Sequence, residues 1–154
     1  MLLKHYLNES DRLYLLNIAL KVDYNKTAYG TNVYRKTLDQ LQDERLNSIV
    51  LKIRDEFNLH FKDYIYRQHY SCFVKINNFG WVSEHKDRLA FNAHTINTNV
   101  LLQKPKDGGF IIHGNVKVIM NEGDLYILDT DVSHGISSLK SDDEYYSLLI
   151  WHSK

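Results

Sequence analysis

Short β-rich runs separated by turn residues fill the chain from residue 71 to residue 152, and this alternation is the strongest constraint on the fold. Runs of this kind are typical of an antiparallel sandwich or barrel. Eight runs can be counted, and eight strands that form two Greek keys make a jelly roll, a cupin-like barrel. The expected strands span residues 71–76, 81–85, 95–103, 109–113, 116–120, 124–128, 133–138 and 145–152.

Residues 1–66 differ from this pattern, because their apolar residues recur at helical spacing. Asn8 or Ser10 can cap a first helix. A second helix is predicted over residues 38–57, with an apolar face made by Leu38, Leu41, Ile49, Val50, Ile53 and Phe57. Both helices are expected to pack on one sheet as support. Residues 23–34 lack periodicity and are expected to form either an ordinary surface loop or a lid over a site.

Length and order of elements predict one α+β domain over residues 1–154, with a helical support over residues 1–66 and a barrel core over residues 70–152. Lys plus Arg and Asp plus Glu number 19 each, so the net charge of the chain does not favour electrostatic binding to nucleic acid. Cys72 is the single cysteine, which excludes an internal disulfide and fits a reducing compartment. No apolar run approaches the length of a membrane span. A soluble, cytoplasmic protein is therefore expected.

Two imidazoles and a carboxylate are the residues most suggestive of chemistry. His85 and Asp87 are two positions apart, so on a regular strand both side chains point to the same face. In a jelly roll the second and seventh strands are neighbours, which brings His134 to the His85 end of the barrel. Two His and one carboxylate hold non-haem ferrous iron on one face and leave other positions open. A structural zinc site would need a fourth ligand, and none follows either segment.

The chain resembles the iron- and 2-oxoglutarate-dependent oxygenases, closest to their prolyl-hydroxylase-like branch. The resemblance covers residues 70–152 and rests on the order of five blocks. These are His85-Lys86-Asp87, Asp107-Gly108-Gly109-Phe110, residues 122–129, His134-Gly135-Ile136 and residues 145–151. It implies a double-stranded β-helix with helices bracing its major sheet, Fe(II) bound by His85, Asp87 and His134, and 2-oxoglutarate as cosubstrate.

One position departs from that resemblance. The last strand of the branch usually opens with an arginine that pairs with the distal carboxylate of 2-oxoglutarate, whereas this chain has Tyr145. A tyrosine hydroxyl lacks the charge and the bidentate geometry of a guanidinium. Asn99 is a candidate amide donor to the cosubstrate, and Trp151 matches an aromatic residue that lines the iron pocket. The cations that could substitute for the missing arginine are Lys140, Arg88, Lys75, Lys104 and His113.

The leading interpretation is a hydroxylase that acts on a small molecule or on a peptide side chain such as a prolyl residue. A cupin-like metal-binding barrel that does not use 2-oxoglutarate is the alternative, since residues 123–134 also have the spacing of a cupin's second motif. The cupin's first motif is missing, because Asp87 stands where a second histidine is expected. A barrel that keeps the ligands but only binds a partner is a third reading. Residues 24–34 and 88–94 are the expected lids.

Overall fold

The computed structural model describes residues 1–87 and 93–154. Two α-helices, α1 (Glu9–Ala19) and α2 (Glu44–His60), and one 3₁₀ turn, η1 (Leu38–Gln40), are found in these residues. The strands are β1 (Leu2–Leu3), β2 (Asn25–Lys26), β3 (Gly30–Thr37), β4 (Ile65–Tyr66), β5 (Cys72–His85), β6 (Thr95–Gln103), β7 (Ile111–His113), β8 (Val116–Val118), β9 (Leu125–Asp129), β10 (His134–Ile136) and β11 (Tyr145–Ser153). None of the described helices is long and apolar enough to cross a membrane.

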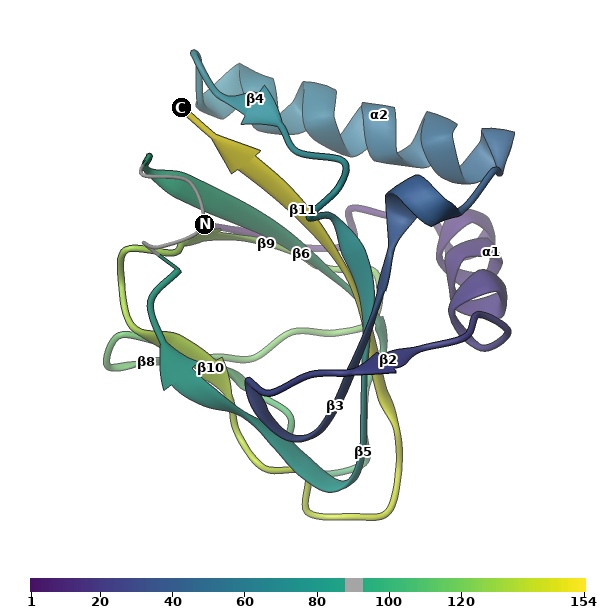
Figure 1. Ribbon diagram of the computed structural model, residues 1–154, viewed down its shortest axis with the longest axis vertical. Coiled ribbons are helices and arrows are strands. Elements are labelled where there is room, and N and C mark those ends of the chain that lie inside the picture. The colour runs from purple at the N-terminus through teal and green to yellow at the C-terminus, as the bar shows by residue number, and fades with distance from the viewer. Residues whose placement is uncertain (88–92) are drawn as a thin grey trace.

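The strands form one curled antiparallel sheet whose main order is β1-β9-β6-β11-β5-β10-β7-β8. The curled sheet has two layers, a larger one that contains β11 and a smaller one that contains β10. Strand β5 belongs to both, because its first half pairs with β11 and its second half with β10. Asn78 and Phe79 have positive φ angles of 47° and 59° in the middle of this strand, where the chain bends from one layer into the other. Figure 1 shows the resulting half-closed barrel, with α1 and α2 on the outside of the sheet. The expected α+β fold, a double-stranded β-helix braced by helices, is confirmed.

The expected pairing of the second and seventh barrel strands is confirmed. The runs expected at residues 71–76 and 81–85 are the two halves of β5, and β10 pairs with the second half. In this pairing His134 lies opposite His85. The barrel therefore brings together two residues that are 49 positions apart in the sequence.

The prediction that residues 1–66 are helical is wrong for residues 30–37. This segment is β3, an eight-residue strand that pairs along β5 and extends the sheet beyond it. Asn32 has a φ of 53°, and the register with β5 shifts between Thr31 and Val33. Such a bulge interrupts the alternation of inward and outward residues, so the strand shows no period in the sequence. The expected loop over residues 23–34 is therefore mostly a short hairpin of β2 and β3.

The second helix begins later than expected. Residues 38–40 form the 3₁₀ turn η1, and α2 starts after Asp43, whose carboxylate accepts the backbone N–H of Leu46 at 2.8 Å. Asn8 caps α1 in the same way, with a 2.8 Å bond from the N–H of Asp11. Carboxylates and amides at this position satisfy N–H groups that have no partner inside the helix.

Two apolar cores lie on opposite faces of the larger layer. The outer core packs α1 and α2 against the sheet, and Ile49 and Ile53 are buried there as the helical spacing predicted. The inner core lies inside the barrel and includes Val33, Ile76 and Tyr145. Some of its members, Val33 among them, also line the cavity described below.

His152 is the one histidine that is fully buried in the outer core. Its ring stacks on Phe57 at 3.7 Å between centroids, and neither ring nitrogen has a hydrogen-bond partner among residues 1–87 and 93–154. Burial, helped by the charge of Arg54, lowers the pKa of His152 from 6.5 to about 4. The folded protein therefore holds this imidazole neutral.

We predict that His152 makes the fold sensitive to acid. The unfolded chain binds its proton more tightly, so the stability that depends on neutral His152 is complete above pH 6.5 and is lost as the pH falls toward about 4. The loss should be roughly 3 kcal/mol. The free energy of unfolding, measured with urea at pH 7 and at pH 4.5, should differ less between the two pH values for His152→Phe than for wild type. His60→Gln, at an exposed position, is the control, and an unchanged slope in His152→Phe would refute the assignment.

Candidate metal centre

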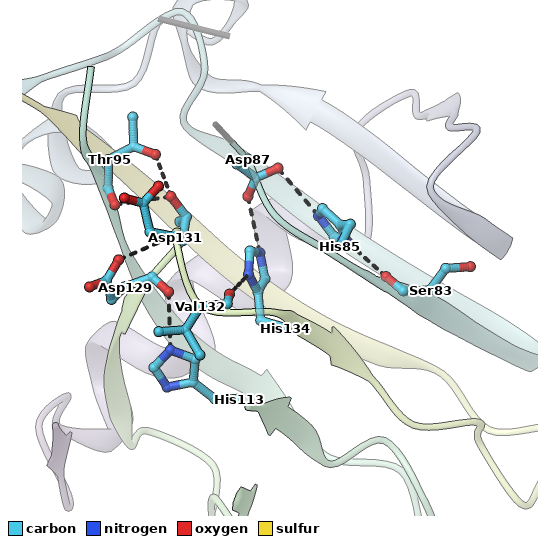
Figure 2. Close-up of polar contacts among 10 residues, drawn as sticks. Ser83, His85, Asp87, Thr95, His113, Asp129, Asp131, Val132 and His134 are labelled. Atoms are coloured by element: carbon cyan, nitrogen blue, oxygen red, sulfur yellow. Dashed lines mark hydrogen bonds and ion pairs between the residues drawn. The ribbon is translucent and has the colours of Figure 1, made fainter. Parts of the chain in front are cut away.

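Three ligand-type side chains converge at the open end of the barrel. Asp87 lies between two imidazoles, with 3.3 Å from its Oδ1 to Nε2 of His85 and 3.0 Å from its Oδ2 to Nε2 of His134 (Figure 2). The centroids of the two rings are 4.6 Å apart. All three potential ligand atoms lie within 4.8 Å of one another, which is the spacing that a single ion can bridge.

Backbone pairing places each of these residues. His85 is the last residue of β5 and His134 the first of β10, where the two face each other in register. Asp87 lies beyond the end of β5 and not on a regular strand as the spacing suggested. Its backbone N–H donates to the carbonyl of Thr130 at 3.2 Å, and this bond ties the segment to the chain that leads into β10.

Hydrogen bonds from Nδ1 to backbone carbonyls fix the orientation of both imidazoles. Nδ1 of His85 lies 2.7 Å from the carbonyl oxygen of Ser83, and Nδ1 of His134 lies 2.9 Å from that of Val132. A carbonyl only accepts, so each Nδ1 donates its N–H there and each ring directs its Nε2 toward Asp87. A hydrogen bond from the distal nitrogen to a carbonyl is the usual way that proteins orient histidines that bind metals.

The electrostatics of the cluster favour a positive charge at its centre. Burial raises the pKa of the Asp87 carboxyl, but hydrogen bonds from His134 and His85 outweigh burial and hold that pKa well below its ordinary value. The hydrogen bond to Asp87 raises the pKa of His85 against the opposing effect of burial. Asp87 is thus an anion that both imidazoles contact through Nε2. A metal cation could take the place of the bridging protons, because a carboxylate and the Nε2 of a deprotonated imidazole are both metal ligands.

A cavity of about 180 Å³ opens beside the three residues. Both layers of the sheet contribute to its wall, and so does β3. His85, Asp87 and His134, here called the metal cluster, line the cavity. The other lining residues are Thr27, Tyr29, Val33, Arg35, Tyr70, Val74, Val82, Asn97, Asn99, Ile111, Leu128, Gly135, Ile136, Ser147, Leu149 and Trp151. Most are apolar, with a few polar groups among them, as is common for small-molecule sites.

Three polar side chains in this wall carry an oxygen atom without a hydrogen-bond partner among the described residues. The side-chain oxygens of Asn97, Asn99 and Ser147 are buried, and none has a hydrogen-bond partner within the described part of the chain. Tyr145 lies next to this group. Burial raises the pKa of its hydroxyl, while the side chains of Ser147 and Asn99 oppose that rise. Buried polar atoms are nearly always paired, so these atoms are suited to a polar ligand or to ordered water.

The residues expected to bind the cosubstrate fall into two groups. Asn99 and Trp151 line the cavity. Tyr145 is buried in the inner core and lines a separate small space of about 10 Å³, so it does not face the cavity directly. Lys140 is exposed and lies outside the cavity wall, because its segment is held by a bridge between Leu139 and Gly108. Tyr145 thus opens the last strand and Lys140 lies before it, and neither residue lines the cavity.

The other cations considered from the sequence are also accounted for. Lys75 makes a 2.7 Å ion pair with Glu144, and Lys104 is exposed. His113 pairs in register with His134, but its ring bonds to the hydroxyl of Tyr126 at 2.8 Å and to a backbone carbonyl. Arg88 and most of the expected lid at 88–94 lie outside the described residues.

Arg35 is a cavity residue that the sequence analysis missed, whereas Tyr29 lies within the expected lid over residues 24–34. Both come from the β2–β3 hairpin, and the ring of Tyr29 stacks on His85 at 5.6 Å between centroids. The signal that could have found Arg35 is the alternation of Val33, Arg35 and Thr37, which places three side chains on one face of a strand.

A second group of possible ligands lies nearby and reads as structural. His94, Asp129 and Asp131 are close enough to share an ion. Both ring nitrogens of His94 are already used, by the hydroxyl of Tyr64 and by Asp129 at 3.0 Å. Asp129 also accepts the backbone N–H of Asp131 at 2.9 Å. These bonds account for the cluster without a metal.

Comparisons with known proteins agree with the fold. A prolyl-4-hydroxylase from Pseudomonas putida is 18% identical, with a TM-score of 0.78 over 100% of this chain and 91% of that chain. HygX from Streptomyces hygroscopicus, solved with nickel and 2-oxoglutarate bound, is 10% identical, with a TM-score of 0.80 over 99% of this chain and 82% of that one. The non-haem α-ketoglutarate-dependent epimerase SnoN, from nogalamycin biosynthesis, is 12% identical, with a TM-score of 0.81 over 100% of this chain and 76% of that one. No family model and no curated protein matches the sequence. The shared feature is the fold of 2-oxoglutarate- and Fe(II)-dependent oxygenases.

We predict that His85→Ala, Asp87→Ala and His134→Ala each weaken the binding of manganous ion. Each removes a ligand, so the loss should exceed the roughly 10–100-fold cost of removing a group that only orients one. Calorimetric titration measures the affinity, and thermal melts check the fold. His113→Gln is the matched control, because this histidine faces His134 in the sheet but has its ring bonded elsewhere. Wild-type affinity in two of the three alanine variants would exclude this site.

Proposed function

We propose that the protein is a non-haem Fe(II)- and 2-oxoglutarate-dependent oxygenase, a hydroxylase of a small molecule or of an exposed peptide side chain. The observation that carries the proposal is the convergence of His85, Asp87 and His134 on one point at the mouth of a cavity. The fold shared with oxygenases supports the same reaction class.

The ligand set fits an iron that reacts. Within the described residues, the group around Asp87 contains three potential ligands and no fourth. Two imidazoles and one carboxylate suit ferrous iron and leave part of its coordination sphere to small molecules. A structural zinc ion would call for four protein ligands. His85, Asp87 and His134 would hold the metal, through Nε2 of each imidazole and through the carboxylate.

The cavity fits a polar cosubstrate with an apolar chain. Bound iron with 2-oxoglutarate and dioxygen would supply an oxidation in which one oxygen atom enters a substrate C–H bond and the other enters succinate, with loss of carbon dioxide. Asn97, Asn99 and Ser147 offer buried side-chain oxygens that have no hydrogen-bond partner within the described residues. Val74, Leu128 and other apolar residues of the wall would exclude water from the reacting groups.

The remaining residues orient these groups. The carbonyls of Ser83 and Val132 hold the proton on Nδ1 of the two imidazoles, which keeps each Nε2 available as a ligand. Trp151 closes one wall of the cavity, and Tyr145 lies beside the Asn99 and Ser147 side chains that would contact the cosubstrate. Tyr145 would therefore act through them. Lys140 has no part in this proposal.

The substrate would enter past Tyr29, which is 54% exposed and stacked on His85. A wall that includes the aromatic side chains of Tyr29, Tyr70 and Trp151 suits a compact group on a small molecule or a peptide. Structures of this fold have been solved with hygromycin B bound in HygX and with a peptide fragment bound in a prolyl hydroxylase from Trichoplax adhaerens. The free, buried thiol of Cys72 supports a cytoplasmic location as part of the proposal.

The test of this function is the fate of 2-oxoglutarate. Protein loaded with ferrous iron under nitrogen and then exposed to air should bind 2-oxoglutarate and release succinate, even slowly and without substrate. His134→Ala should do neither, whereas Ser133→Ala, a change at the neighbouring position, should behave as wild type. A wild-type protein that binds manganous ion but neither binds nor consumes 2-oxoglutarate would favour the cupin-like alternative.

A further inference from the structure

The wall of the cavity contains one arginine and no lysine among the described residues, and that arginine is Arg35. It lies on β3, where it pairs in register with Val74 of β5, and Val74 pairs with Ser147 of β11. All three side chains line the cavity. Arg35 is therefore in the same row of the sheet as one of the unpartnered polar groups.

Two neighbours locate the guanidinium group more closely. Its central carbon is 5.9 Å from the centroid of the Tyr29 ring, which in turn stacks on His85. The guanidinium also lies close to the buried thiol of Cys72. Burial raises the pKa of Cys72, and the charge of Arg35 opposes that rise. The positive charge thus lies inside the barrel, beside the metal cluster and not at the outer surface.

Arg35 has no counter-ion within the described residues. Arginines in other parts of the fold have one: Arg12 pairs with Glu9, Arg45 with Asp11 and Arg54 with Asp55. Among residues 1–87 and 93–154, the cavity wall holds a single carboxylate, Asp87, which both imidazoles already contact. A half-buried guanidinium costs desolvation energy unless an anion joins it, and its planar fork matches a carboxylate with two parallel hydrogen bonds.

We propose that Arg35 binds the distal carboxylate of 2-oxoglutarate, as a cation delivered from β3 to a cavity that lacks one on β11. This inference rests on the proposed function. Tyr145 cannot replace Arg35, because it is neutral and lines a different space. Asn99 and Ser147 would complete the carboxylate site with uncharged hydrogen bonds. Arg35 would then select an oxo acid with two carboxylates over one with a single carboxylate.

Binding to the manganese-loaded protein under nitrogen tests this assignment without turnover. Two oxo acids serve as probes, 2-oxoglutarate and 2-oxobutyrate, which keeps the metal-chelating end and lacks the distal carboxylate. Arg35→Met should lower the affinity for 2-oxoglutarate by about ten- to hundredfold, the cost of losing a charge-assisted hydrogen bond. It should leave the affinity for 2-oxobutyrate unchanged. Arg35→Lys should recover part of the lost affinity for 2-oxoglutarate. Lys36→Met is the matched control, since it removes the same charge from the other face of β3.

The outcomes separate this inference from the function on which it rests. Equal 2-oxoglutarate affinity in wild type and Arg35→Met would overturn the role of Arg35 while the oxygenase proposal stands. The Arg35 guanidinium would then be available to bind a carboxylate of the substrate. Equal losses for both oxo acids would also overturn it, because Arg35 would then act on the metal end or on the fold. No binding of either oxo acid to wild type would remove the proposed function itself. Unchanged manganese affinity in Arg35→Met establishes that the variant is folded.

Discussion

The short pairing of β10 with the end of β5 is the contact on which the rest of the site depends. It sets His134 opposite His85, and the same stretch of backbone supplies the two carbonyls that fix the imidazoles. Side chains alternate between the two faces of a sheet, so a slip of β10 by one residue would turn the His134 ring away from Asp87. The bend of β5 at Asn78 and Phe79 makes this pairing possible, because one strand thereby joins both layers.

The two helices and the β2–β3 hairpin support this site in different ways. The helices α1 and α2 cover the outer face of the larger layer and bury its apolar side chains. The β2–β3 hairpin extends the same layer past β5 and closes one side of the cavity with Tyr29 and Arg35. The N-terminal part of the chain is thus both scaffold and wall. A barrel made only of residues 70–152 would lack Arg35, the one arginine or lysine that lines the cavity among residues 1–87 and 93–154.

Much of the barrel could be predicted from sequence, because alternating β-rich runs and turn residues report directly on local structure. The approach of His134 to His85 followed from topology alone, since neighbouring strands must share an end. The β3 strand was missed because its bulge at Asn32 hides the alternation. Tyr145 and Lys140 were chosen by their place along the last strand and the turn before it, and neither lines the cavity. Which buried residue faces a given space depends on packing between layers, and no local pattern encodes that.

The central claim is that His85, Asp87 and His134 form an open metal site. A crystal structure of the protein grown under nitrogen with manganous ion and 2-oxoglutarate tests it most directly. The account predicts one metal ion bound by Nε2 of both imidazoles and by the carboxylate, with the oxo acid occupying two of its remaining positions. A metal ion closed by a fourth protein side chain, or a triad without metal at saturating manganous ion, would contradict it.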